Sequence, residues 1–514
     1  MSKTQNSRET LIFGPPGCGK TYTLINIVRE ALRNGTPPDR IGFVSFTRKS
    51  ITEARERAGA ELGLTSNDTP YFRTLHSMGF LWTGMRQSDI INIYDLRQIG
   101  LEMGMIFDNR EIYDEDGQII MSAKEGNKYL TLIQRAKMRM VTLEYEFNEN
   151  ADYQMHWELL QKLDQVYKNY KKEFGKVDFT DMIEKMVLQG TGPNLDLLIV
   201  DEAQDLTPLQ WQQVKILSKN ADRIYYAGDD DQAIFRYTGV NVRYMLNICS
   251  DIEVLNQSYR VPKSVHNLST NIAFRISRRQ SKDWSPRDEE GSINFHMSFD
   301  ELNLEEGSWT VMARTTKGLT RIGDELKRNG QMFLRNGRLS FNQDSLRGMQ
   351  AWAALSQGRA IPTEEAIHLY SLMPKRGDKA QVKHGMAKTL ETIDPSTVLS
   401  YDDLVSNHGL LCSKESSSED AINLNEEDRI YWRSLCRRYR DGIPIQPKIK
   451  LSTIHRMKGG EDDNVLLLQD MGYLSHKSLE TNPDDEHRVF YTAVTRTKQN
   501  LHILESDTNY GYPL

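Results

Sequence analysis

The chain has 514 residues, a length that indicates several domains. With 38% hydrophobic and 26% charged residues, its composition is that of a globular protein. No apolar run approaches the roughly 20 residues that a membrane span needs, and the polar segment before Leu11 lacks the form of a secretory signal. The four cysteines lie far apart in the sequence, which argues against a disulfide framework or a zinc or iron–sulfur site. We therefore expect a cytoplasmic protein.

The formal net charge of -6 is not that of a protein that coats nucleic acid. Charges are screened over about 10 Å in ordinary salt, so a local basic groove can still hold phosphates on an acidic molecule. Basic residues cluster at Arg48–Arg57, Arg275–Lys282 and Arg433–Arg440. Each cluster fits either such a groove or a solvated helix face.

Apolar runs typical of buried strands recur along the chain, and polar, helix-like segments follow them. These runs are Leu11–Phe13, Ile41–Phe46, Leu197–Val200, Ile224–Ala227, Thr310–Ala313 and Val465–Leu468. Strands that alternate with helices indicate parallel sheets in an α/β fold.

Two long stretches have a different, mostly helical pattern. In residues 77–176, Leu160, Leu163, Val166, Tyr167 and Tyr170 recur at helical spacing. Residues 345–447 look helical as well, and their low-complexity run Ser413–Asp420 predicts a linker or exposed loop. We therefore predict two α/β cores with one helical insertion each. The first core comprises residues 1–76 and 177–285, with its insertion at 77–176, and the second comprises 286–344 and 448–514, with its insertion at 345–447.

The segment Gly14–Thr21, with the sequence GPPGCGKT, lies between a predicted strand and the predicted helix Tyr22–Leu32. This is the phosphate-binding loop pattern, in which Gly14, Gly17 and Gly19 let backbone N–H groups wrap the phosphates of a nucleotide. Lys20 is predicted to reach the β- and γ-phosphates, and the Thr21 hydroxyl to bind Mg²⁺.

Asp201 and Glu202 follow the apolar run Leu197–Val200 directly. A buried strand that ends in two adjacent carboxylates suits an ATPase that carries a phosphate-binding loop. Asp201 is predicted to bind Mg²⁺, and Glu202 to polarise the attacking water. ATP and Mg²⁺ are the expected cofactors.

Four further segments resemble motifs of the UvrD/Rep-type DNA helicases of superfamily 1: Ala227–Phe235, Leu255–Arg260, Thr453–Glu461 and Arg488–Arg496. The resemblance implies that the two predicted cores are RecA-like motor domains. It also implies a set of nucleotide contacts: Gln232, Arg260 and Arg496 at the γ-phosphate, Tyr259 on the adenine, and Glu461.

Shorter segments, Ser45–Lys49 and Arg73–His76, resemble the family's motifs that contact single-stranded DNA. The DNA contacts that the resemblance implies are Phe46, Thr47, His76, Tyr237, Thr453 and His455. For Phe46 and Tyr259, a place in the hydrophobic core is the alternative. The chain departs from the family at Tyr237–Gly239, where Trp-Arg-Gly is usual, and at Arg48, where Asn is usual.

The resemblance implies an ATP-dependent DNA helicase that moves 3′-to-5′ on single-stranded DNA and unwinds tailed duplexes. A translocase that removes or loads proteins without much unwinding is the alternative. The sequence does not distinguish the two, because the element that would separate the strands carries no motif of its own.

Overall fold

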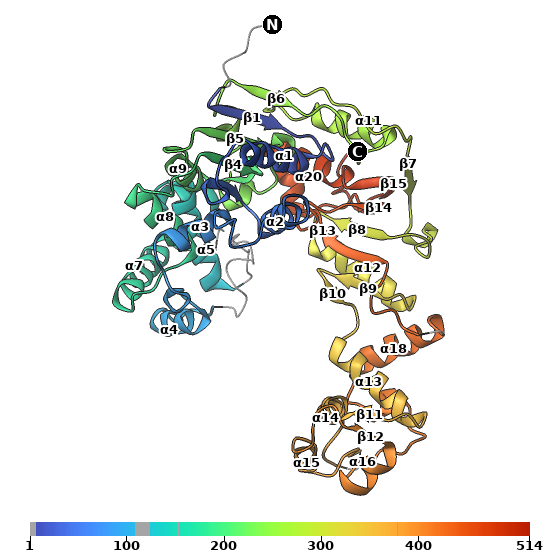
Figure 1. Cartoon of the computed structure of the whole chain (residues 1–514). Coiled ribbons are helices and arrows are strands. Elements are labelled where there is room, and N and C mark those ends of the chain that lie inside the picture. Colours follow the sequence, from blue (N-terminus) through green and yellow to red (C-terminus); the bar gives the residue numbers. More distant parts are fainter. Residues whose placement is uncertain (1–6, 108–123, 152–153, 378, 441) are drawn as a thin grey trace. The chain divides into compact units, whose positions relative to one another are not determined.

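The computed structural model describes residues 7–107, 124–151, 154–377, 379–440 and 442–514. The chain divides into two compact units (Figure 1). The first unit contains the chain up to residue 293 together with residues 473–499 and 514, and the second contains residues 294–472 and 500–513. Within the described residues, no helix is long and apolar enough to cross a membrane.

The first unit is built on a six-stranded sheet in the order β3-β2-β4-β5-β1-β6. Every neighbouring pair in it is parallel. Its strands are β1 (Glu9–Phe13), β2 (Ile41–Ser45), β3 (Phe72–Thr74), β4 (Leu197–Asp201), β5 (Arg223–Gly228) and β6 (Ile252–Val254). Strands β2 and β4 are buried along their whole length, as central strands of a covered parallel sheet are. The four strands predicted for this part of the chain are confirmed.

Further helices of the first unit pack against this sheet or against one another. They include α1 (Lys20–Arg33), α2 (Arg48–Leu62), α9 (Pro208–Ser218), α10 (Arg243–Leu246), α11 (Lys263–Ala273), α19 (Tyr473–Thr481) and α20 (Pro483–Val494). On α1 and α2, Leu24, Val28 and Ala54 are fully buried and join one hydrophobic cluster with Phe43 and Ile199 of the sheet. Burial of these apolar faces is the main term that holds the helices to the sheet.

The remaining helices of the first unit follow β3 in the chain, and all but the first of them contribute to a separate hydrophobic cluster. They are α3 (Leu75–Trp82), α4 (Ile93–Met103), α5 (Glu125–Arg139), α6 (Leu143–Asn150), α7 (Trp157–Glu173) and α8 (Phe179–Gln189). The predicted periodicity is confirmed in α7, where Leu160, Leu163 and Tyr167 point into this cluster. A buried ion pair ties α7 to α8, because Lys171 Nζ lies 2.6 Å from both Asp178 and Asp181.

The second sheet has seven strands in the order β10-β9-β13-β8-β14-β15-β7. They are β7 (Ser292–His296), β8 (Trp309–Ala313), β9 (Phe333–Arg335), β10 (Arg338–Leu339), β13 (Ile449–Thr453), β14 (Asp462–Leu468) and β15 (Thr497–Leu504). Strand β8 pairs in parallel with β13 and β14, and β13 pairs in parallel with β9. Helix α12 (Thr316–Arg328) packs Ile322 and Leu326 onto this sheet. The prediction of an α/β fold with two parallel sheets, as in two RecA-like domains, is confirmed.

Residues 343–438 are mostly helical, as predicted. They form α13 (Gln343–Ser356), α14 (Thr363–Leu372), α15 (Ala387–Leu390), α16 (Tyr401–Asn407), α17 (Ser418–Ala421) and α18 (Glu426–Arg438), with the short pair β11 (Ile361–Pro362) and β12 (Val398–Leu399). Trp352 and Tyr370 are fully buried in a separate hydrophobic cluster that these helices form.

Candidate functional site

The segment Gly14–Thr21 connects the end of β1 to the first turn of α1. Gly17 and Gly19 have φ angles of 73° and 80°, a left-handed conformation that favours glycine. A Cβ atom on Gly17 would lie 2.3 Å from Cβ of Arg260, and one on Gly14 would lie 1.9 Å from Cγ of Lys20. A side chain would therefore clash at Gly14 and Gly17, and the backbone would be strained for any other residue at Gly17 and Gly19. The backbone N–H groups of the loop lead into a helix N-terminus, the usual geometry for binding phosphates.

Lys20 lies beside the carboxylates at the end of β4. Its Nζ donates a hydrogen bond to the Gly14 carbonyl oxygen at 3.0 Å. Burial acts to lower the pKa of Lys20, but the negative charges nearby, above all Glu202, outweigh it and raise the pKa. Lys20 therefore carries its positive charge at neutral pH.

Asp201 is 3% exposed, and burial together with the neighbouring Glu202 raises its pKa to about 7. Glu202 has a φ of 51°, in the left-handed region that residues other than glycine rarely adopt. Its N–H donates to Asp201 Oδ1 at 2.9 Å. A buried carboxylate and the Thr21 hydroxyl are the hard oxygen donors that Mg²⁺ prefers, so these residues fit that ion.

Gln232 and Arg496 meet in the first unit, although 264 positions separate them in sequence. Gln232 ends the short helical turn η4 (Asp230–Gln232) after β5, and Arg496 follows α20. Arg496 Nη2 donates to Gln232 Oε1 at 2.6 Å, while Gln232 Nε2 donates to Asp229 Oδ2 at 2.7 Å. Arg496 is only 2% exposed.

Tyr259 and Arg260 lie directly against the phosphate-binding loop. The N–H of Tyr259 donates to the Gly17 carbonyl oxygen at 2.8 Å, and Ser258 Oγ donates to the Pro16 carbonyl oxygen at 2.7 Å. The Tyr259 side chain is 73% exposed, so its ring is at the surface beside the loop and not in the core. Glu461, which is also exposed, belongs to the second unit, between β13 and β14.

A cavity of about 380 Å³ lies among α2, β3, α3 and α8 in the first unit. Three arginines and a histidine are among its lining residues, and none of the described lining residues is acidic: Arg48, Ile51, Thr52, Arg55, Phe72, Arg73, Thr74, His76, Ser77, Phe80, Gln87, Ile90, Phe179 and Met182. Burial and the charge of Arg73 lower the pKa of Arg55. The lining suits an anion, because a bound negative charge offsets the repulsion between closely spaced cations.

His76 is 4% exposed, and neither of its ring nitrogens has a hydrogen-bond partner among the described residues. Burial lowers its pKa to about 4. The imidazole is therefore neutral at physiological pH and has one donor and one acceptor still to be satisfied.

Comparison of the sequence with known proteins identifies its family. Residues 2–253 match the UvrD/REP helicase N-terminal domain, and residues 405–508 match the UvrD-like helicase C-terminal domain. The chain belongs to the UvrD/Rep helicase family. It is 21% identical to the putative ATP-dependent DNA helicase YjcD of Bacillus subtilis, over 97% of this chain and 77% of that protein.

Other members of the UvrD/Rep family align over a shorter part of their length. The probable DNA helicase II homolog of Mycoplasma capricolum is 27% identical over 62% of this chain and 45% of that protein. The ATP-dependent DNA helicase PcrA of Bacillus subtilis is 26% identical over 57% of this chain and 41% of that protein. The chain thus spans less than half the length of these two relatives.

The UvrD/Rep-type residues predicted to contact DNA lie in different environments. Phe46 is 2% exposed and its ring lies 5.8 Å from that of Phe235, so in this conformation it is not available to a base. Thr47 caps α2 by accepting a hydrogen bond from the Ser50 N–H. Tyr237 is 39% exposed. The contacts of these residues with DNA stay predictions.

Two more of the predicted contacts, Thr453 and His455, belong to the second unit, where β13 ends and the loop toward β14 begins. Both are partly exposed. Thr453 Oγ1 accepts a hydrogen bond from the Arg456 N–H at 3.4 Å, which fixes the start of this loop.

Two basic residues outside the recognised motifs contact the segment Ala227–Phe235. Arg279 donates two hydrogen bonds to Asp231, at 2.8 and 2.7 Å, and Lys282 contacts Asp229, Asp230 and Asp231. Both belong to the cluster Arg275–Lys282, for which a phosphate groove and a solvated face were the two interpretations. For these two members neither applies, because their charges are directed inward.

Proposed function

We propose that this protein is an ATP-dependent DNA helicase that moves 3′-to-5′ along single-stranded DNA and unwinds tailed duplexes. The observation that carries the proposal is the grouping of a phosphate-binding loop, two carboxylates, Gln232 and Arg496 within one compact unit. Such a set supports hydrolysis of a nucleoside triphosphate, because phosphoryl transfer needs positioning and charge stabilisation more than covalent chemistry. The family membership supports DNA as the substrate. A motor of this kind acts on intracellular DNA.

In this proposal each residue of the ATP site has a separate task. Lys20 and the loop N–H groups bind the β- and γ-phosphates, while Thr21 and Asp201 hold Mg²⁺, which neutralises phosphate charge when bound. Glu202 accepts the proton of the attacking water. Three further side chains, Gln232, Arg260 and Arg496, stabilise the charge that develops on the transferred phosphoryl group. Tyr259 stacks on the adenine. Glu461, in the second unit, stays a predicted nucleotide contact.

The strand-binding part of the proposal rests on the cavity among α2, β3, α3 and α8. Its arginines offer bidentate donors that suit a phosphodiester, and the neutral ring of His76 supplies a further hydrogen bond. Tyr237, exposed as a ring, provides a surface on which a base stacks. Thr453 and His455, in the second unit, stay predicted contacts of the strand.

Strand displacement tests the proposal directly. The purified protein is given ATP, Mg²⁺ and duplexes that carry a single-stranded 3′ or 5′ tail. We expect displacement from the 3′-tailed duplex only, and none when a non-hydrolysable ATP analogue replaces ATP. ATP hydrolysis that DNA stimulates without any displacement would favour the translocase instead. Absence of hydrolysis with and without DNA would refute both functions.

A further inference from the structure

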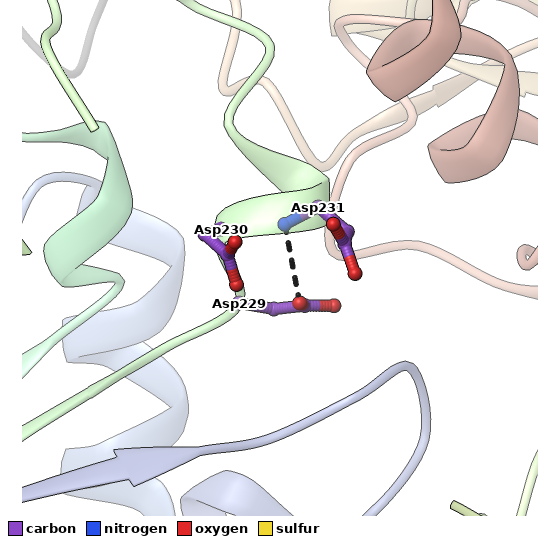
Figure 2. A group of neighbouring side chains, drawn as sticks. All are labelled: Asp229, Asp230 and Asp231. Carbon is purple, nitrogen blue, oxygen red and sulfur yellow. Dashed lines mark hydrogen bonds between the residues drawn. The ribbon is translucent and has the colours of Figure 1, made fainter. Parts of the chain in front are cut away.

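Three consecutive carboxylates, Asp229, Asp230 and Asp231, lie buried where β5 leads into η4. Figure 2 shows their side chains close together, and one oxygen atom of each lies within 4.8 Å of the others. Buried negative charges at this spacing repel one another strongly and are not solvated by water. The cluster therefore requires positive charge from its surroundings.

Lys282 supplies that charge from within the chain. Its Nζ lies 3.1 Å from Asp229 Oδ1 and 2.9 Å from Asp231 Oδ2, and it also contacts Asp230. The Lys282 side chain is completely buried. Its ammonium lies 5.3 Å from the ring centroid of Phe13, the last residue of the strand before the phosphate-binding loop. An ammonium group therefore takes the central place that a metal ion would take in an isolated acidic cluster.

Neighbouring segments hold the same three residues from other directions. Arg279 forms a bidentate ion pair with Asp231, and the Gln280 N–H donates a hydrogen bond to Asp230 Oδ2 at 2.8 Å. From α20, Arg488 Nε donates to the Asp230 carbonyl oxygen at 2.9 Å. The turn η4 is thus fixed by both its side chains and its backbone.

The contacts of Asp229 continue toward the ATP site. Its Oδ1 accepts from Lys282 and from the Asp231 N–H at 3.3 Å, the dashed line in Figure 2. Its Oδ2 accepts from Gln232 Nε2, and Gln232 Oε1 accepts from Arg496. An amide has one donor side and one acceptor side, so the bond to Asp229 directs the Gln232 oxygen toward Arg496.

We propose that Lys282, supported by Arg279, is a positioning residue of the ATPase centre: it holds Asp229 so that Gln232 presents its carbonyl oxygen to Arg496. This inference rests on the proposed function. Lys282 touches neither nucleotide nor DNA in this scheme and acts only through Asp229 and Gln232. Fixing the orientation of groups before the reaction is a general way in which surrounding residues contribute to rate.

A double-mutant cycle on ATP turnover tests this role. Lys282→Met, Gln232→Ala and the double variant are compared with the parent for kcat and for the KM of ATP. We expect Lys282→Met to lower kcat by about ten- to hundredfold with KM little changed, the range found when a group that orients a ligand residue is removed. In the Gln232→Ala background, Lys282→Met should lower kcat by less than about threefold, because the residue through which Lys282 acts is gone.

Lys171→Met is the matched control, since Lys171 is likewise a buried lysine between aspartates of the first unit. It should lower the Tm to a similar extent, leave the kcat of the folded fraction near that of the parent, and combine additively with Gln232→Ala.

If Lys282→Met also combines additively with Gln232→Ala, or retains normal kcat, the positioning role is refuted. Should Lys282→Met fail to fold, Arg279→Gln takes its place in the same cycle with the same expected loss of additivity. A parent that does not hydrolyse ATP would instead refute the proposed function.

Discussion

His76, which lines the cavity among α2, β3, α3 and α8, makes the stability of the folded protein depend on pH. Its pKa is about 4 in the folded protein because the ring is buried, compared with 6.5 for an exposed histidine. Between these values the unfolded chain binds a proton that the folded protein does not, so stability is complete above pH 6.5 and is lost as the pH falls toward 4. We expect the parent to lose about 2 to 3 kcal/mol of unfolding free energy through His76 between pH 7 and pH 4.5.

The measurement is urea denaturation at both pH values for the parent and for His76→Phe, whose ring is similar in size and does not titrate. The variant should lack this part of the acid destabilisation. Equal losses in the two proteins would mean that His76 keeps its ordinary pKa in the folded protein. The buried geometry beside Phe179 would then be wrong.

Functional residues can be identified from the sequence where they lie in one contiguous motif. Lys20, Thr21 and the glycines form one contiguous loop, and Asp201 and Glu202 follow a run that is recognisably a buried strand. Lys282 could not be identified in this way, since Asp230 is 52 positions away and the surrounding basic residues look like a surface cluster. The burial of Phe46 likewise depends on a partner, Phe235, that only the fold brings near.

At the scale of elements, α20 joins the Arg496 segment to the turn that carries Gln232. Arg488 donates a hydrogen bond to the Asp230 carbonyl oxygen at the start of η4, and Arg496 donates one to Gln232 at its end. Ser277 donates a hydrogen bond to Asp484 at the start of α20. If Arg496 acts mainly on the transition state, Arg496→Ala should lower kcat by about a thousandfold or more and change ATP binding little. Steady-state turnover and the Kd of a fluorescent ATP analogue measure the two effects separately. Normal turnover with weakened ATP binding would assign this arginine to ground-state binding.

Elements were predictable where burial imposes a pattern over several residues. Strands β4 and β14 are apolar runs because both faces of a parallel sheet are covered, and both were expected from sequence. Strands β3 and β6 have three residues each, too few to show a period, and they were not predicted. That residues 473–499 group with the first unit follows from contacts distant in sequence, which no local pattern contains.

For the molecule as a whole, the proposal separates the place where ATP is hydrolysed from the places where DNA is held. The phosphate-binding loop follows β1, whereas the basic cavity lies among α2, β3, α3 and α8. Variants at the two places should therefore have opposite effects. Lys20→Ala should abolish ATP hydrolysis and strand displacement while most of the affinity for single-stranded DNA remains, as measured by fluorescence anisotropy without nucleotide.

Arg55→Met is the reciprocal variant, since this arginine lines the cavity and its Nε has no hydrogen-bond partner among the described residues. It should leave DNA-free ATP hydrolysis near the parent value and weaken binding of single strands of every sequence. Loss of one phosphate contact should also reduce the slope of log K against log salt by about 0.7, because one fewer contact releases counterions. An unchanged slope would place the strand elsewhere on the protein. Loss of DNA binding in Lys20→Ala would show that the two sites are not separate.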